Sequence, residues 1–267
     1  VAIFCAVVVI GGVKRIGSVT EKLVPFMAVI YIVCALIVVI AHAGNLGSVF
    51  GAIFTGAFHP QAVAGGVIGA TIMTTIQKGV ARGVFSNEAG LGSAPIAHAA
   101  SSETNPVRQG LYGIFEVFMD TIVICTLTSL VVLIGSLNGA FAADWGGSGG
   151  TPLVSASFGA VMGGQVGSLI VAIGISLFAL STILSWSLYG VRCFEFLFGT
   201  AATQVYKWVF IVVVVIGATL EMQLVWDIAD TLNGLMALPN LIALFALSGV
   251  VVAKTKEFFG NKANLEA

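Results

Sequence analysis

Residues 24–43, VPFMAVIYIVCALIVVIAHA, form an apolar run that contains no charged side chain. A helix needs about 20 such residues to cross the roughly 30 Å of hydrocarbon in a bilayer. The rest of the chain has the same character, because 58% of its 267 residues are hydrophobic and only 9% are charged. A soluble domain carries about 25% charged residues. The sequence therefore predicts an all-α polytopic membrane protein.

Further apolar runs predict a transmembrane domain over residues 1–253 and a polar cytoplasmic tail at 254–267. The expected spans lie at about 1–12, 24–43, 62–100, 110–137, 165–190, 205–221 and 228–253. The first is too short to cross a bilayer, begins within an apolar run and lacks the basic start of a signal peptide. We therefore expect it to be the end of a longer helix in an N-terminally truncated chain.

Lysine and arginine fall on one side of this topology. With a cytoplasmic loop at 13–22, the tail and the loop at 101–109 are also cytoplasmic, whereas the outer loops contain neither residue type. Those outer loops are 44–61, 138–164 and 222–227. This is the positive-inside pattern of proteins in the cytoplasmic membrane. The chain has only 11 Lys and Arg residues, no basic cluster and no HExxH motif, so we expect no nucleic-acid partner, no enzymatic activity and no organic cofactor.

The segment 62–100 is too long for one straight span. A continuous helix of this length would measure roughly 58 Å, about twice the hydrocarbon thickness, so we expect it to be interrupted. The expected breaks are at Gly79, Gly83, Gly90, Gly92 and Pro95. Broken helices form the midplane binding sites of secondary transporters. The alternative is an ordinary helix–loop–helix without substrate contact.

Charged and polar side chains in this region provide candidate site residues. Thr75 and Gly79 border the expected break, where free backbone groups would bind the carboxylate and ammonium groups of a substrate. Lys78 and Arg82 should avoid lipid, and they are the expected partners of Asp120, which lies four residues after Glu116 on one face of span 110–137. We predict either that these charged residues form structural ion pairs or that one of the two carboxylates couples transport to a proton or cation.

Two stretches carry a family resemblance: GVARGVFSNEAGLGSAPIAHAA at 79–100 and GGVKRIGSVTEKLVPFMAVIYI at 11–32. They resemble the sodium:alanine symporters, the alanine/glycine:cation symporter family. The resemblance implies a LeuT-type fold of five helices plus five inverted helices. On that reading the chain is a C-terminal fragment that runs from the end of core helix 4 through core helix 10. The N-terminal helices of the same protein are then its missing partners.

The resemblance also implies a function. The expected activity is co-transport of a small neutral amino acid, alanine or glycine, with Na⁺, or with H⁺ in some members, across the cytoplasmic membrane by alternating access. The alternatives are a non-transporting structural fragment of such a carrier and a channel or pore subunit.

Span 165–190 contains several hydroxyl-bearing residues, and oxygen ligands suit a hard cation such as Na⁺. The resemblance maps a sodium site to the carbonyl of Phe178 and the hydroxyls of Ser181 and Thr182. The alternative is that these hydroxyls bond their own helix. Trp186 lies four residues after Thr182 on the same face. We expect both to contact the substrate and Trp186 to limit its size, unless Trp186 belongs to the interfacial aromatic belt.

Overall fold

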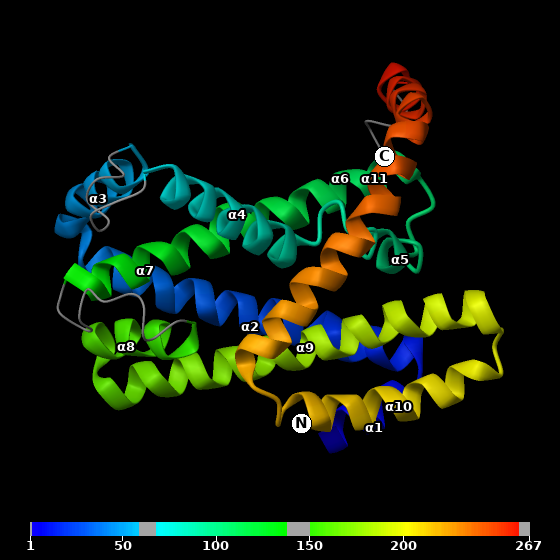
Figure 1. The fold of residues 1–267 in the computed structure, drawn as a ribbon, viewed down its shortest axis with the longest axis horizontal. Helices are drawn as coiled ribbons and strands as arrows, with labels where there is room; N and C mark the ends of the chain where they lie inside the picture. Colours follow the sequence, from blue (N-terminus) through cyan, green and yellow to red (C-terminus); the bar gives the residue numbers. More distant parts are fainter. Residues whose placement is uncertain (1, 59–67, 138–149, 262–267) are drawn as a thin grey trace. The chain divides into compact units, whose positions relative to one another are not determined.

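The computed structural model describes residues 2–58, 68–137 and 150–261, and every regular element in these ranges is helical (Figure 1). The elements are α1 (Ala2–Ile10), α2 (Val13–Ala41), η1 (Ala43–Asn45), α3 (Leu46–Phe58), α4 (Ile68–Asn87), α5 (Ala94–His98), α6 (Pro106–Val117), η3 (Phe118–Cys125), α7 (Thr126–Leu137), α8 (Thr151–Met162), α9 (Gly164–Phe198), α10 (Ala202–Gly217) and α11 (Met222–Gly260). The predicted all-helical class is confirmed.

Within the described residues, 4 helical stretches are long and apolar enough to cross a membrane. They are Lys14–Ala41, Pro106–Leu137, Gly164–Phe198 and Met222–Gly260. Two shorter apolar helices are Thr151–Met162 and Ala202–Gly217. The chain therefore has the helices of a multi-pass membrane protein, as its composition predicts.

Two segments that we expect to be outer loops contain helices. α3 lies within 44–61 and α8 lies within 138–164. α8 begins with a proline among its first helical residues, a position where the missing backbone N–H costs nothing. It continues with small and apolar residues that pack against neighbouring helices. The absence of Lys and Arg, which defined these segments as outer, does not distinguish a loop from a short apolar helix.

The chain divides into two compact units. Unit 1 comprises Val1–Lys78 and Ile122–Ser187, and unit 2 comprises Gly79–Thr121 and Leu188–Ala267. In unit 1, α7 packs against α8 and α2 (Figure 1). One buried cluster of this unit draws on α2, α3, α7, α8 and α9 and consists of Ala35, Val38, Val39, Val49, Leu130, Val131, Ile134, Phe158 and Val171.

The contact between α7 and α8 depends on a glycine. A Cβ atom on Gly135 would lie only 2.6 Å from the hydroxyl oxygen of Ser157 and 2.8 Å from its Cα. Both residues are buried. Small residues let helix backbones approach closely in membranes, where packing rather than the hydrophobic effect holds helices together.

The interruption of segment 62–100 falls later than two of the expected breaks. α4 runs without interruption through Gly79 and Gly83, so the prediction of breaks at these two glycines is wrong. The helix ends at Asn87, after which Glu88, Gly90 and Gly92 all have positive φ angles, of 54°, 88° and 85°. A glycine inside a helix costs only about 1 kcal/mol, whereas a left-handed backbone terminates the helix.

Candidate functional site

In unit 1, α9 brings together two of the three predicted sodium ligands. The hydroxyl of Ser181 donates a 2.8 Å hydrogen bond to the carbonyl oxygen of Phe178. The Ser181 side chain is only 6% exposed and also lies 3.9 Å from the sulfur of Met27 on α2. A buried hydroxyl and a carbonyl oxygen therefore lie side by side in an otherwise apolar helix. The bond within the helix that we considered as the alternative for Ser181 is present.

Thr182 faces away from this buried pair. Its side chain is exposed, because consecutive residues of an α-helix point about 100° apart. Among the described residues, its hydroxyl has no hydrogen-bond partner. Trp186 is half-buried one turn further along α9. The helix thus provides a buried hydroxyl at 181 that is bonded to the carbonyl of Phe178, and an exposed hydroxyl at 182.

An aromatic and hydroxyl cluster surrounds Phe178 and was not anticipated from the sequence. The ring of Tyr31 on α2 meets the ring of Phe178 edge-on at 5.9 Å. Its hydroxyl forms a hydrogen bond with that of Thr128 on α7. Tyr31 also lies 6.0 Å from Phe158 on α8. The sequence shows only that Tyr31 and Thr128 are hydroxyl-bearing residues in two apolar spans. It does not show that the two side chains are in contact.

The candidate substrate residues of α4 are placed only in part. Thr75 and Lys78 lie in the continuous helix, but their side chains fall outside the described part of the structure. Gly79 is exposed, and no atom lies within 4 Å of the position that a Cβ atom would take there. These positions lie within α4 and not at its end, so substrate contact by Thr75 and Gly79 stays a prediction.

In unit 2, Arg82 pairs with a residue that the sequence analysis did not select. Its guanidinium lies 2.7 Å from the carboxylate of Asp230 on α11 and 4.1 Å from the ring centre of Trp226. The expected pairing of Arg82 with Asp120 is therefore wrong. Asp230 is 148 residues away along the chain, and only the tertiary structure brings the two charges together.

Asp120 contacts α4 through hydrogen bonds instead. Its carboxylate accepts a 2.7 Å bond from the hydroxyl of Ser86, and Asn87 donates a 3.1 Å bond to the hydroxyl of Thr121. Asp120 and Thr121 belong to η3, a π-helical stretch, and such stretches are frequent at functional sites. Glu116 lies 3.3 Å from the ring nitrogen Nε2 of His98.

The backbone reversal after α4 is held by side chains from two other helices of unit 2. The carboxylate of Glu88 accepts a 2.6 Å bond from Ser93 and a bond from the hydroxyl of Tyr189 on α9. Asn240 on α11 donates a 3.0 Å bond to the carbonyl of Gly90. The motif at 79–100 therefore folds into a tightly bonded junction between α4, α9 and α11.

Long apolar helices with polar groups held inside them define a multi-pass membrane protein, with the kind of intramembrane sites that transporters use. The chain matches the sodium:alanine symporter family over residues 1–267 and belongs to this family. The predicted family is confirmed, and the chain is a multi-pass protein of the cell membrane. The family consists of transporters and not of enzymes.

Individual relatives give the same result. The chain is 51% identical over 257 residues to the sodium/alanine symporter AgcS of Methanococcus maripaludis, covering 96% of this chain and 55% of that protein. It is 38% identical over 263 residues to the probable sodium/glutamine symporter GlnT of Bacillus subtilis, covering 98% and 53%. The amino-acid carrier protein AlsT of Bacillus subtilis is 36% identical over 259 residues, covering 96% and 53%. The chain thus spans about half the length of the curated relatives it matches.

Proposed function

We propose that the complete protein is a secondary active transporter that carries a small neutral amino acid together with Na⁺ across the cytoplasmic membrane by alternating access. The observation that carries this proposal is the match of the whole chain to the sodium:alanine symporter family. A relative that is 51% identical is named a sodium/alanine symporter, which favours alanine as the substrate. The proposed architecture is the LeuT-type arrangement of inverted helix repeats.

The oxygen atoms of α9 support a role in binding the transported Na⁺. The carbonyl of Phe178 and the hydroxyl of Ser181 are 2.8 Å apart, and the hydroxyl oxygen keeps acceptor capacity beyond the bond that it donates. The hydroxyl of Thr182 follows on the next position of the same turn. Na⁺ would be held by these three groups as part of its oxygen shell. This ion is cargo, so moderate affinity suits the role, because the ion must also be released.

We assign the substrate contacts to Thr75, Gly79, Thr182 and Trp186. The indole of Trp186 is large and half-buried, and it lies one turn from Thr182 on the same face. A rigid aromatic side chain at this position would leave room for the side chain of alanine or glycine and exclude larger ones. Relatives named for alanine and for glutamine are consistent with substrate size being a property that differs within the family.

The test is uptake of radiolabelled alanine by the complete protein in proteoliposomes. We expect saturable uptake that requires an inward Na⁺ gradient and is inhibited by unlabelled glycine and alanine. A proton gradient without Na⁺ is the matched control and should drive little uptake. Uptake driven by protons alone would overturn the choice of ion, and flux that does not saturate would indicate a channel or pore subunit.

A further inference from the structure

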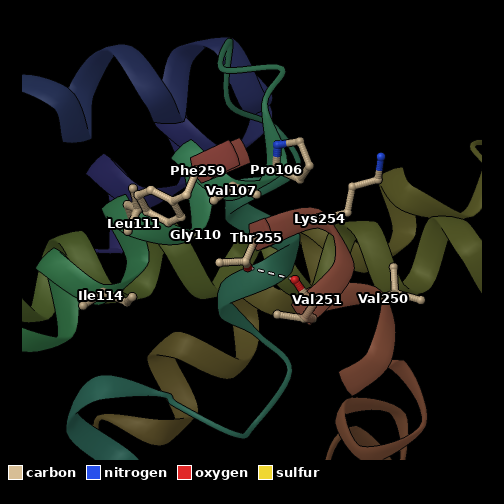
Figure 2. A pocket seen from close by; sticks show the side chains of 10 residues that line it. All are labelled: Pro106, Val107, Gly110, Leu111, Ile114, Val250, Val251, Lys254, Thr255 and Phe259. Atoms are coloured by element: carbon tan, nitrogen blue, oxygen red, sulfur yellow. Dashed lines mark hydrogen bonds between the residues drawn. The ribbon is translucent and has the colours of Figure 1, made fainter. Parts of the chain in front are cut away.

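The structure contains a cavity in unit 2 that the proposed transport cycle does not use (Figure 2). It has a volume of about 450 Å³, within the range of small-molecule sites in proteins. The first turns of α6 and the last turns of α11 form its walls. The lining residues include Val107, Leu111, Ile114, Val250, Val251 and Phe259. Apart from the residues at its mouth, the cavity is therefore almost wholly apolar.

The mouth of the cavity has a positive charge. Lys254 is the one charged side chain among the described residues that line it. The neighbouring hydroxyl of Thr255 donates to the carbonyl of Val251, as drawn in Figure 2, so it is already satisfied within α11. Lys254 also borders a smaller cavity of about 110 Å³ that Asn105 and Glu257 line. A ligand that fits this arrangement has an apolar part and an anionic head.

The position of the cavity along α6 and α11 indicates which leaflet of the membrane would supply a lipid ligand. α6 begins at Pro106, and the apolar part of α11 ends just before Lys254, so both mark the same membrane surface. The distribution of Lys and Arg predicts that this surface is cytoplasmic. Ile114 lies roughly 12 Å along α6 from Pro106, a depth that corresponds to the upper part of the acyl chains. The cytoplasmic leaflet is the anionic one.

The charges around the mouth include both signs. Lys254 lies 2.9 Å from Glu257, and Arg108 lies 3.7 Å from Glu103, while Lys256 is exposed on the last turns of α11. The side chains of Lys254 and Glu257 are 56% and 70% exposed, and exposed pairs of this kind are weak. Lys254 can therefore exchange Glu257 for a phosphate, or share its three N–H donors between them.

We propose that this cavity binds an anionic phospholipid of the cytoplasmic leaflet, with an acyl chain against Leu111 and Ile114 and the phosphate at Lys254. The side chains of Leu111, Ile114, Val250 and Val251 are 42%, 68%, 56% and 58% exposed, so the described residues leave the apolar wall of the cavity open to a ligand. Basic pockets between transmembrane helices at the cytoplasmic surface are the established setting for anionic lipid heads. The inference concerns lipid binding and does not depend on the identity of the transported substrate.

The experiment measures lipid binding to the delipidated complete protein by native mass spectrometry. Phosphatidylglycerol is compared with phosphatidylcholine of the same acyl chains. We expect one tightly bound phosphatidylglycerol, and we expect Lys254→Gln to weaken it by about tenfold, the effect of losing a hydrogen bond to a charged group. Lys256→Gln, on the same helix but outside the cavity, is the matched control and should change binding less than about twofold.

A second pair of variants tests the apolar part of the site. Gly110 lines the cavity, and a Cβ atom there would meet no atom within 4 Å, so the side chain introduced by Gly110→Leu begins in open space and should occupy part of the cavity. This variant is expected to weaken binding of the lipid by at least about tenfold, because every acyl-chain methylene that the leucine displaces from the cavity loses its burial. Gly249→Leu on α11 has the same open surroundings and lies outside the lining, so it should leave binding intact.

Four results would overturn the proposal. Equal affinity for the two lipids would show that Lys254 does not select an anionic head. Equal effects of Lys254→Gln and Lys256→Gln would place the lipid elsewhere. A photo-crosslinking residue at Ile114 that joins another protein segment, and not lipid, would show that protein covers the cavity. Labelling of a cysteine at Ser102 by an impermeant reagent from outside would place the site in the wrong leaflet. Thermal unfolding without lipid identifies any variant that fails to fold.

Discussion

The two neighbouring hydroxyls of α9 allow a sharp test of the proposed sodium site, because the structure treats them differently. Ser181 is buried and bonded to the Phe178 carbonyl, whereas Thr182 is exposed and has no such bond within the described residues. Ser181→Ala and Thr182→Val each remove one hydroxyl. Valine keeps the branched shape of threonine, so the second change removes an oxygen with little change of volume.

The expected magnitudes follow from these surroundings. Ser181→Ala removes a buried hydrogen bond, so the free energy of unfolding should fall by about 1 kcal/mol. Thr182→Val breaks no such bond, so the change in stability should stay within about 0.5 kcal/mol. If both hydroxyls are sodium ligands, each loss removes an interaction with a charged group worth about 1.5–3 kcal/mol. The Na⁺ concentration for half-maximal uptake should then rise about tenfold or more in both variants.

The assay is alanine uptake by the complete protein in proteoliposomes, measured over a range of Na⁺ concentrations, with thermal unfolding in detergent as the stability measurement. The decisive variant is Thr182→Val, because its effect on Na⁺ is predicted without an effect on stability. An unchanged Na⁺ dependence with full alanine uptake in this variant would refute the proposed role of the hydroxyl. A Ser181→Ala variant that is less stable but has normal Na⁺ dependence would reduce Ser181 to a structural role.

Three further predictions concern other parts of the molecule. Trp186→Ala should let valine and leucine compete better for alanine uptake, because each newly buried methylene is worth about 0.8 kcal/mol; an unchanged ranking of inhibitors would show that the indole does not line the site. Gly135→Ala should lower the free energy of unfolding by about 1–3 kcal/mol through the clash with the neighbouring helix, whereas Gly174→Ala, in open surroundings, should not, and equal unfolding temperatures would contradict the close approach. Arg82→Ala and Asp230→Ala should be non-additive by about 1 kcal/mol in a double-mutant cycle of unfolding; strict additivity would argue against the ion pair.

Much of the architecture was predictable because hydrophobicity is a local property of the sequence. A run such as 24–43 must be helical in a bilayer, since its backbone groups have no water to bond with. The prediction was wrong about where α4 is interrupted, because the end of a helix depends on several weak local preferences that oppose one another. Gly79 and Gly83 are tolerated within α4, because helix hydrogen bonds outweigh the small cost of each glycine. The helix ends only where Glu88 and the following glycines adopt left-handed backbone angles.

Some features of the candidate site were also predictable from the sequence, whereas others depend on helix packing. The spacing of Phe178, Ser181 and Thr182 places the three residues within one helical turn, and the structure shows the oxygens of Phe178 and Ser181 in contact. The sequence also identified Arg82 as a charge that needs a partner inside the protein. The sequence did not indicate which hydroxyl is buried, because that depends on the packing of α2 against α9 around Met27.

The sequence by itself determined that this is a helical membrane protein of the sodium:alanine symporter family, because composition, run length and motif are all local. Only the tertiary structure decided that Arg82 pairs with Asp230 and that α6 and α11 enclose an apolar cavity with Lys254 at its mouth. The physical reason is that a charged residue in an apolar segment of the sequence shows only that an opposite charge must lie near it in the folded protein. Which of several distant carboxylates compensates it depends on how the helices pack.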